Sequence, residues 1–274
     1  THLPASVPMA GSFTGRNCCA AVLAVVIIGL MVAASAGSWY THQVEYSTSQ
    51  SGDGSSIPDT SNSLLNATKT WYDLQGYKTE KSTRNANRGP TTVSEYLNYS
   101  ARSGTLKHIF KTVQAFVLVA LLSAIVMFIL IVAFFFDRIR NKIVFALGMT
   151  VTRLLLVLFA CLILLSVIIA FLVFIGVTQG FKDEYQSCVE GPCRKFVDST
   201  DAEYQVSCAY LQQFGYTTTA GTQCKITEDR KWGPTEGWYI TLGAIPVAAI
   251  LLIVVVINKF PLPIDSEASS GEAL

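Results

Sequence analysis

Cysteines carry the most reactive side chains of this chain, and their spacing predicts structural disulfides. Four of them crowd one short polar segment, an arrangement typical of disulfide-bonded segments in an oxidising compartment. They are Cys188, Cys193, Cys208 and Cys224. No two of them have the two-residue spacing of a thiol redox site. Four cysteines allow three pairings, and our hypothesis is the nested one, Cys188 with Cys224 and Cys193 with Cys208.

The other three cysteines, Cys18, Cys19 and Cys161, lie in apolar sequence. Cys18 and Cys19 stand at one end of an apolar run, where palmitoylation is one hypothesis. Their burial as small apolar side chains is the equal alternative. Two sequons, Asn66-Ala67-Thr68 and Asn98-Tyr99-Ser100, predict glycan acceptors at Asn66 and Asn98. A chance match of so short a motif is the alternative.

Catalytic chemistry finds little support in the sequence. His42 and His108 are isolated from each other, and no nucleophile elbow, phosphate-binding glycine loop or metalloprotease motif occurs. We therefore expect no enzyme activity, no cofactor and no metal site. The net charge is +1 and no long basic stripe is present, which argues against a nucleic-acid partner.

Four long apolar runs determine the class of the protein. They cover residues 17–37, 112–136, 154–177 and 237–258 and contain no Lys, Arg, Asp or Glu. A helix needs ~20 residues to cross ~30 Å of hydrocarbon, so each run predicts one crossing. The first run is too long for a signal peptide and three more crossings follow, so we expect it to be a retained anchor. The predicted fold is an all-α membrane protein, a four-transmembrane-helix bundle with a small β-rich, disulfide-containing extracellular domain formed by the two outer loops.

Basic residues near the ends of the runs predict the orientation, because cytoplasmic flanks are enriched in Lys and Arg. The basic residues that flank the runs all fall on the same side of the membrane in this threading; they are Arg16, Arg138, Arg140, Lys142 and Lys259. Residues 1–16 are then a cytoplasmic N-terminus, 137–153 a cytoplasmic hairpin with a helix extension, and 259–274 a disordered cytoplasmic tail. Residues 38–111 and 178–236 are the two extracellular loops. The protein is therefore predicted to be an integral multi-pass protein of the plasma membrane or an endomembrane.

The first outer loop predicts strands. After the aromatic pair Trp39-Tyr40, the alternating apolar residues Val44 and Tyr46 predict a first strand. Residues 68–74 and 77–79 predict two strands around a turn at Gln75-Gly76. Residues 91–99 predict a further strand. The Ser- and Gly-rich stretch from 47 to 63 predicts a mobile loop. We also expect exposed aromatic side chains in the two loops, at Trp71, Tyr72, Tyr77 and Trp232.

Small residues predict where helices approach one another. Gly29, Ala33 and Gly37 lie four residues apart on one face of the first run, which should contact another helix in the chain or in a neighbouring copy. Gly243, Ala244 and Ala248 form a weaker version in the fourth run.

The threading, the strand-rich first outer loop and the short inner hairpin together resemble the claudin-like tetraspan superfamily. Trp39 and Trp71 stand where claudins carry aromatic signature residues, but the first outer loop has no cysteine pair. The cysteines of the second outer loop are similar to those of tetraspanins, without their Cys-Cys-Gly motif. A function through contacts is expected for a different reason, because distinctive chemistry is absent while nearly half of the chain lies in the predicted outer loops.

The functional hypothesis is a non-enzymatic tetraspan glycoprotein that acts as an adhesion, assembly or scaffolding subunit. Its expected partners are membrane lipid, further copies of itself or a larger membrane assembly, and an extracellular protein. The alternative is a pore-forming or accessory subunit of an oligomeric channel, although the crossings contain no ionisable residue of the kind that ion-coupled transport uses.

Overall fold

The computed structural model describes residues 10–50, 63–85, 89–99, 104–136, 143, 149–184, 191–209 and 223–257. Its internal contacts divide the chain into two units. The helical unit comprises Thr1–Ala33, Ala115–Ala170 and Ile240–Leu274, and the sheet unit comprises Ala34–Gln114 and Phe171–Tyr239.

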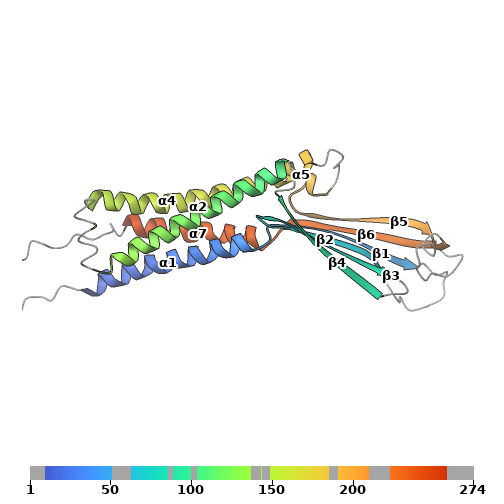
Figure 1. Ribbon diagram of the computed structural model, residues 1–274, viewed down its shortest axis with the longest axis horizontal. Coiled ribbons are helices and arrows are strands. Elements are labelled where there is room, and N and C mark those ends of the chain that lie inside the picture. The colour runs from blue at the N-terminus through green and yellow to red at the C-terminus, as the bar shows by residue number, and fades with distance from the viewer. Residues whose placement is uncertain are drawn as a thin grey trace, which may run out of the picture. The chain divides into compact units, whose positions relative to one another are not determined.

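Four long helices contribute to the helical unit. They are α1 (Ala10–Ala36), α2 (Thr105–Ala133), α4 (Met149–Ile175) and α7 (Glu236–Ile257). All four are long and apolar enough to cross a membrane, and within the unit their segments run alongside one another (Figure 1). Among the described residues of the unit, every exposed side chain is apolar or glycine. The prediction of four apolar spanning helices is confirmed, and an outer surface of this kind suits lipid.

Each of these helices buries one face at helical spacing. In α1 the buried face carries Ala20, Ala24, Ile27 and Met31, and in α7 it carries Ala244, Ala248 and Leu251. The hydroxyls of Ser123, Thr152, Ser166 and Thr241 are also buried. Small residues and inward hydroxyls are the side chains that allow helices to approach in lipid.

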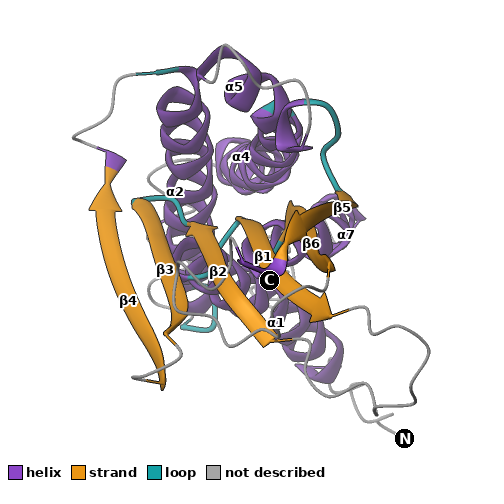
Figure 2. Cartoon of the chain, turned by 90° about the vertical axis from the view of Figure 1, so that its right-hand side faces the viewer, coloured by secondary structure: helices purple, strands orange, loops and turns teal. Residues whose placement is uncertain are grey.

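The sheet unit is built around six antiparallel strands (Figure 2). The first of the two predicted outer loops supplies β1 (Tyr40–Gln50), β2 (Ser63–Tyr72), β3 (Gly76–Asn85) and β4 (Gly89–Asn98). The second supplies β5 (Asp198–Ser207) and β6 (Gln223–Pro234), preceded by the short helix α5 (Val177–Glu184) and the turn η2 (Gly191–Cys193). The order is β4-β3-β2-β1-β6-β5, so pairing of β1 with β6 joins the two loops into one sheet.

The turn between β2 and β3 explains the role of one glycine. The Asp73 carboxylate accepts hydrogen bonds from the backbone N–H groups of Gln75 and Gly76, at 2.8 and 2.6 Å. A Cβ on Gly76 would lie 2.4 Å from the Leu97 carbonyl oxygen of β4. Only glycine therefore fits this close approach of two strands.

An aromatic cluster forms the core of the sheet unit. Trp39, Tyr40, Tyr99, Phe110 and Phe174 are fully buried. Trp39 packs edge-on against Phe174 with ring centroids 5.2 Å apart, and its indole N–H donates to the Ala34 carbonyl at 2.7 Å. Tyr72, at 5% exposed, also belongs to this cluster, so the expectation that it is exposed is wrong.

The boundaries of several strands differ from the sequence-based expectation. β1 continues through Ser47 to Gln50 and β2 begins at Ser63, so the ends of the expected mobile loop are strand. Residues 51–62 lie outside the described part of the chain. Much of the predicted cytoplasmic hairpin and both chain ends also lie outside it.

Candidate functional site

A buried carboxylate organises the polar face of β1, β5 and β6. Glu228 of β6 is only 3% exposed. Its Oε1 accepts from the Tyr46 hydroxyl at 3.0 Å and from Arg230 Nε at 2.5 Å, and its Oε2 accepts from the Tyr204 hydroxyl at 3.1 Å. Each oxygen of the Glu228 carboxylate thus accepts at least one hydrogen bond, as burial of a charged group requires.

Strand register brings these residues together. Glu228 and Arg230 are two residues apart in β6 and therefore share a face. Tyr46 of β1 lies directly opposite Glu228 in the β1–β6 pair. Tyr204 of β5 is paired with Ile226, one diagonal step from Glu228. The network thus depends on residues from both of the predicted outer loops.

The network fixes the charge of both ionised partners. Burial alone raises the pKa of Glu228, but the hydrogen bonds from Arg230, Tyr46 and Tyr204 together with the positive charge of Arg230 outweigh it, and the pKa lies below its usual value. The hydrogen bond to Glu228 raises the pKa of Arg230. Glu228 is therefore a carboxylate and Arg230 a cation at neutral pH.

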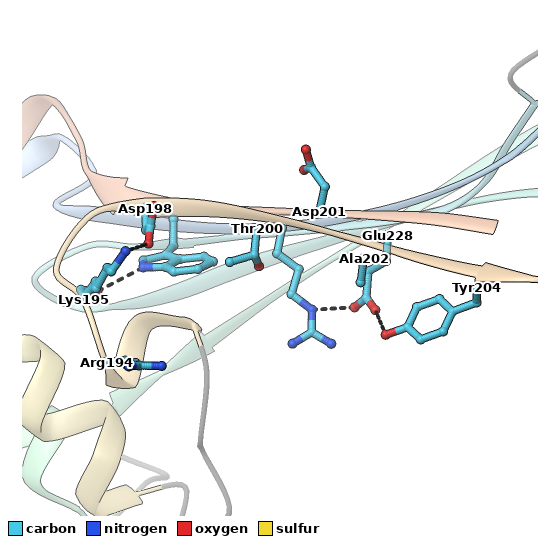
Figure 3. A pocket seen from close by; sticks show the side chains of 10 residues that line it. Arg194, Lys195, Asp198, Thr200, Asp201, Ala202, Tyr204 and Glu228 are labelled. Carbon is cyan, nitrogen blue, oxygen red and sulfur yellow. Dashed lines mark hydrogen bonds and ion pairs between the residues drawn. The ribbon is translucent and has the colours of Figure 1, made fainter. Parts of the chain in front are cut away.

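An open pocket of about 380 Å³ lies over this network (Figure 3). One wall is the segment after η2, where Lys195 accepts a hydrogen bond from Trp232 Nε1 through its carbonyl at 3.0 Å. The Lys195 ammonium pairs with Asp198 at 2.5 Å. The residues that line the pocket are Arg194, Lys195, Asp198, Thr200, Asp201, Ala202, Tyr204, Glu228, Arg230 and Trp232. The pocket thus combines charged side chains with the Thr200 hydroxyl and the exposed Tyr204 ring, a lining more polar than that of most small-molecule sites.

The opposite edge of the sheet presents a different kind of surface. β4 pairs only with β3, so one side of its backbone has no partner strand among the described residues. All side chains from 91 to 98 are exposed. Val93 is 66% exposed and Tyr96 is 52% exposed. An exposed edge with apolar side chains is a surface to which another strand can pair.

The structure places the predicted disulfide residues as follows. Cys208 and Cys224 form a disulfide with a Cα–Cα distance of 5.1 Å, at the far end of the β5–β6 pair. Cys193 is also disulfide-bonded, and Cys188 lies outside the described residues. The nested pairing is therefore wrong, because the antiparallel pairing of β5 with β6 brings Cys208 to Cys224 instead.

The predicted glycan acceptors both lie in the sheet unit. Asn66 is exposed in β2 and Asn98 is exposed at the end of β4. Exposure leaves room for a glycan at each side chain. Glycosylation remains a prediction.

The small-residue seam of α1 faces outward. Gly29 and Ala33 are exposed, Gly37 is half-buried, and a Cβ on Gly29 would meet nothing within 4 Å. The expected contact inside the chain is therefore absent at Gly29 and Ala33, and contact with a neighbouring copy stays a prediction. In α7, Ala244 and Ala248 are buried while Gly243 is exposed. Cys18 and Cys19 are exposed free thiols, accessible to the predicted palmitoylation.

Sequence reasoning missed the Glu228 network and expected Trp232 to be exposed, whereas it is 4% exposed. The signal available was the alternation Ile226, Glu228, Arg230, Trp232, which places all four side chains on one strand face. The two histidines lie on different elements, with His42 partly buried in β1 and His108 exposed in α2. Burial and the nearby charge of Arg230 lower the pKa of His42.

No protein-family model matches this chain, and no curated protein matches it in sequence. The function is therefore argued from its own residues.

Proposed function

We propose that this chain is a non-enzymatic four-span membrane protein that works by contacts, as an adhesion, assembly or scaffolding subunit. The sheet unit is the part that recognises a partner. In this proposal the partner is a further copy of the chain or an extracellular protein, and lipid surrounds the helices.

The observation that carries the proposal is the open edge of β4. Its residues from 91 to 98 are exposed, and a strand added along such an edge gains a row of backbone hydrogen bonds. Val93, Tyr96 and Leu97 would add apolar contacts to those bonds. Edge strands that must stay single usually carry Lys, Pro or inward charges. β4 carries Pro90 at its second residue, but from 91 to 98 the only such feature is the charge of Glu95.

A contact platform has to be rigid, and the sheet unit has three devices for this. β1 pairs with β6 along its whole length, from Tyr40 opposite Pro234 to Gln50 opposite Cys224. The aromatic cluster fixes one end of the sheet, and the Cys208–Cys224 disulfide closes the β5–β6 pair at the other. Preorganisation of this kind lowers the entropic cost of binding.

The sheet unit lies outside the cell or in the lumen in this proposal. Support comes from its disulfide, which favours an oxidising compartment, and from the exposure of both Asn66 and Asn98. Glycosidase treatment of protein from its own membrane should lower the apparent mass. The mass of the double variant Asn66→Gln, Asn98→Gln should not change, and an unchanged mass of the natural protein would remove this support.

A pore-forming role has less support. A pore between copies needs polar groups on an outward face, yet all exposed side chains described in the helical unit are apolar or glycine. The hydroxyls of Ser123 and Ser166 are directed into the unit, where they suit helix-to-helix hydrogen bonds. Planar-bilayer recordings of purified protein should therefore give no unitary conductance.

The proposal is tested by crosslinking in native membranes followed by native mass spectrometry. We expect a species heavier than one chain, containing either a second copy or a second protein. Recovery of isolated single chains alone, under conditions that crosslink a known membrane complex in the same sample, would contradict the proposal.

A further inference from the structure

We propose that the pocket over β5 and β6 binds a sugar that carries one carboxylate, with Arg230 and Arg194 as the groups that recognise the charge. This site is separate from the β4 edge and does not depend on the proposed contact function. Figure 3 shows the pocket residues.

The first step is the state of the Arg230 side chain. A guanidinium has five N–H donors, and only Nε–H is engaged by Glu228. The side chain is 37% exposed, so its terminal amino groups are accessible from the pocket. Those groups can form a paired hydrogen bond with a carboxylate. Because Tyr46 and Tyr204 hold Glu228 in place, the arginine is oriented before a ligand arrives.

The second step is the charge of the pocket. The charge of Lys195 is balanced by Asp198. The charge of Arg230 is balanced by Glu228, which contacts its Nε and leaves the terminal amino groups unengaged by Glu228. Arg194 is exposed and has no partner among the described residues. Asp201 is directed to the opposite side of β5 from Glu228 and Tyr204 (Figure 3). Asp201 borders the pocket from that far side, so on the side of Glu228 three cations, Arg194, Lys195 and Arg230, meet two carboxylates, Asp198 and Glu228. This side has an excess of one positive charge.

This excess selects the kind of anion. A phosphate carries about −1.5 to −2 charges at neutral pH, and two carboxylates of the chain already stand in the pocket. A second negative charge would be repelled without a compensating cation. A carboxylate, with a single charge and a planar fork, matches the remaining donors.

The third step is the body of the ligand. Tyr204 is 48% exposed and presents ring surface, and its hydroxyl, which donates to Glu228, can still accept a hydrogen bond. The exposed Thr200 supplies a second hydroxyl. A volume of about 380 Å³ lies in the lower part of the range for small-ligand sites, about 300 to 1,000 Å³. Aromatic surface beside scattered hydroxyls suits a polyhydroxylated ring better than an acidic peptide, which would need a row of backbone partners.

The test is a titration of sugar probes into the full-length chain in nanodiscs, with the heat of binding measured by calorimetry. Two acidic probes distinguish the sources of the carboxylate: 3′-sialyllactose for a sialic acid and glucuronate for a uronic acid. Lactose and glucose are their neutral counterparts. We expect at least one acidic probe to bind and its neutral counterpart to bind at least tenfold more weakly.

Variants assign the binding to the pocket. Arg230→Lys keeps the charge beside Glu228 but removes the fork, and should weaken binding at least tenfold. Arg194→Ala removes an exposed cation without a described partner and should weaken it severalfold while the chain stays folded. Lys81→Ala removes an exposed cation of β3 outside the pocket and should leave binding unchanged.

Several results would overturn the inference. Equal binding of acidic and neutral sugars would remove the role of the charge. Absence of binding by both acidic probes at millimolar concentration would remove the site. Unchanged affinity in the Arg194→Ala variant, which does not disturb the Glu228 network, would place any sugar binding elsewhere. None of these results bears on assembly through β4.

Discussion

Gly237, the second residue of α7, offers a test of how tightly the aromatic cluster is packed. A Cβ at this position would lie 2.5 Å from both Cδ1 and Nε1 of Trp39 and 3.0 Å from the Ser38 carbonyl oxygen. Carbon atoms normally approach to about 3.5 to 4.0 Å, so the Gly237→Ala variant requires the indole to move by about 1 Å.

The indole has no easy direction in which to move. Trp39 is fully buried, packs against Phe174 and donates to the Ala34 carbonyl. Overpacking of a filled core costs about 1 to 3 kcal/mol, and loss of the indole hydrogen bond adds about 1 kcal/mol. We therefore expect the Gly237→Ala change to lower the free energy of unfolding by about 2 to 4 kcal/mol.

Gly243 in the same helix is the matched control. A Cβ there would meet nothing within 4 Å, and alanine is favoured over glycine inside a helix by up to about 1 kcal/mol. Both variants should be compared by thermal and denaturant unfolding in one detergent, with tryptophan fluorescence as the readout. Gly243→Ala should match or exceed the natural protein. If Gly237→Ala is as stable as Gly243→Ala, the packing around Trp39 is not as tight as these distances require.

Three further predictions concern the disulfide, the buried carboxylate and the α1 seam. Replacing Cys208 and Cys224 together by Ser should lower the free energy of unfolding by about 3 kcal/mol, since the bridge closes a 16-residue separation. Peptide mapping of the unreduced protein should recover Cys208 linked to Cys224. A different partner for Cys208 would contradict the register of β5 and β6. The pKa of Glu228 is lower in the folded chain than its ordinary value of 4.5, so its stabilising contribution is fully present above that pH and is lost as the pH falls through the lower folded value. The Glu228→Gln variant should therefore be less stable than the natural protein at pH 7, with a gap that narrows in acid, and a gap independent of pH would exclude the carboxylate as its source. Because Ala33 is exposed in a single chain, Ala33→Leu should leave thermal stability in detergent unchanged and reduce oligomer size in native membranes, and an unchanged oligomer would show that the seam is incidental.

The elements that the sequence predicts well are those with a strong local signal. A spanning helix is specified by a long apolar run, and all four such runs form helices. The turn at Gln75-Gly76 is specified by Asp73, whose carboxylate caps two backbone N–H groups of that turn. These features need no knowledge of distant partners.

Residues that depend on distant pairing could not be predicted in this way. β5 is an edge strand of mostly polar, exposed residues, which lacks the apolar alternation of a half-buried strand. The Glu228 network needs Tyr46 of β1 to lie opposite β6, and no local pattern contains that register. The disulfide pairing follows from the same register, so the nested hypothesis was wrong for the same reason.

Burial was also misjudged where a residue type has two common environments. Tyr72 and Trp232 were expected at the surface because they lie in polar loops, but they are 5% and 4% exposed. Large aromatic side chains bury much area each, which makes them suited to the core of a small sheet unit. In α1, the small residues Gly29 and Ala33 were expected to face a helix, whereas the buried face is that of Ala24 and Ile27.

Site-specific photo-crosslinking in native membranes tests the contact function most directly. A benzophenone amino acid at Val93, which is 66% exposed on the β4 edge, should yield a crosslinked species heavier than one chain. The same probe at Lys182, exposed in α5 of the same unit, should yield single chains only. If neither position crosslinks, or if both do so equally while the protein is folded, the β4 edge is not the contact surface of this protein.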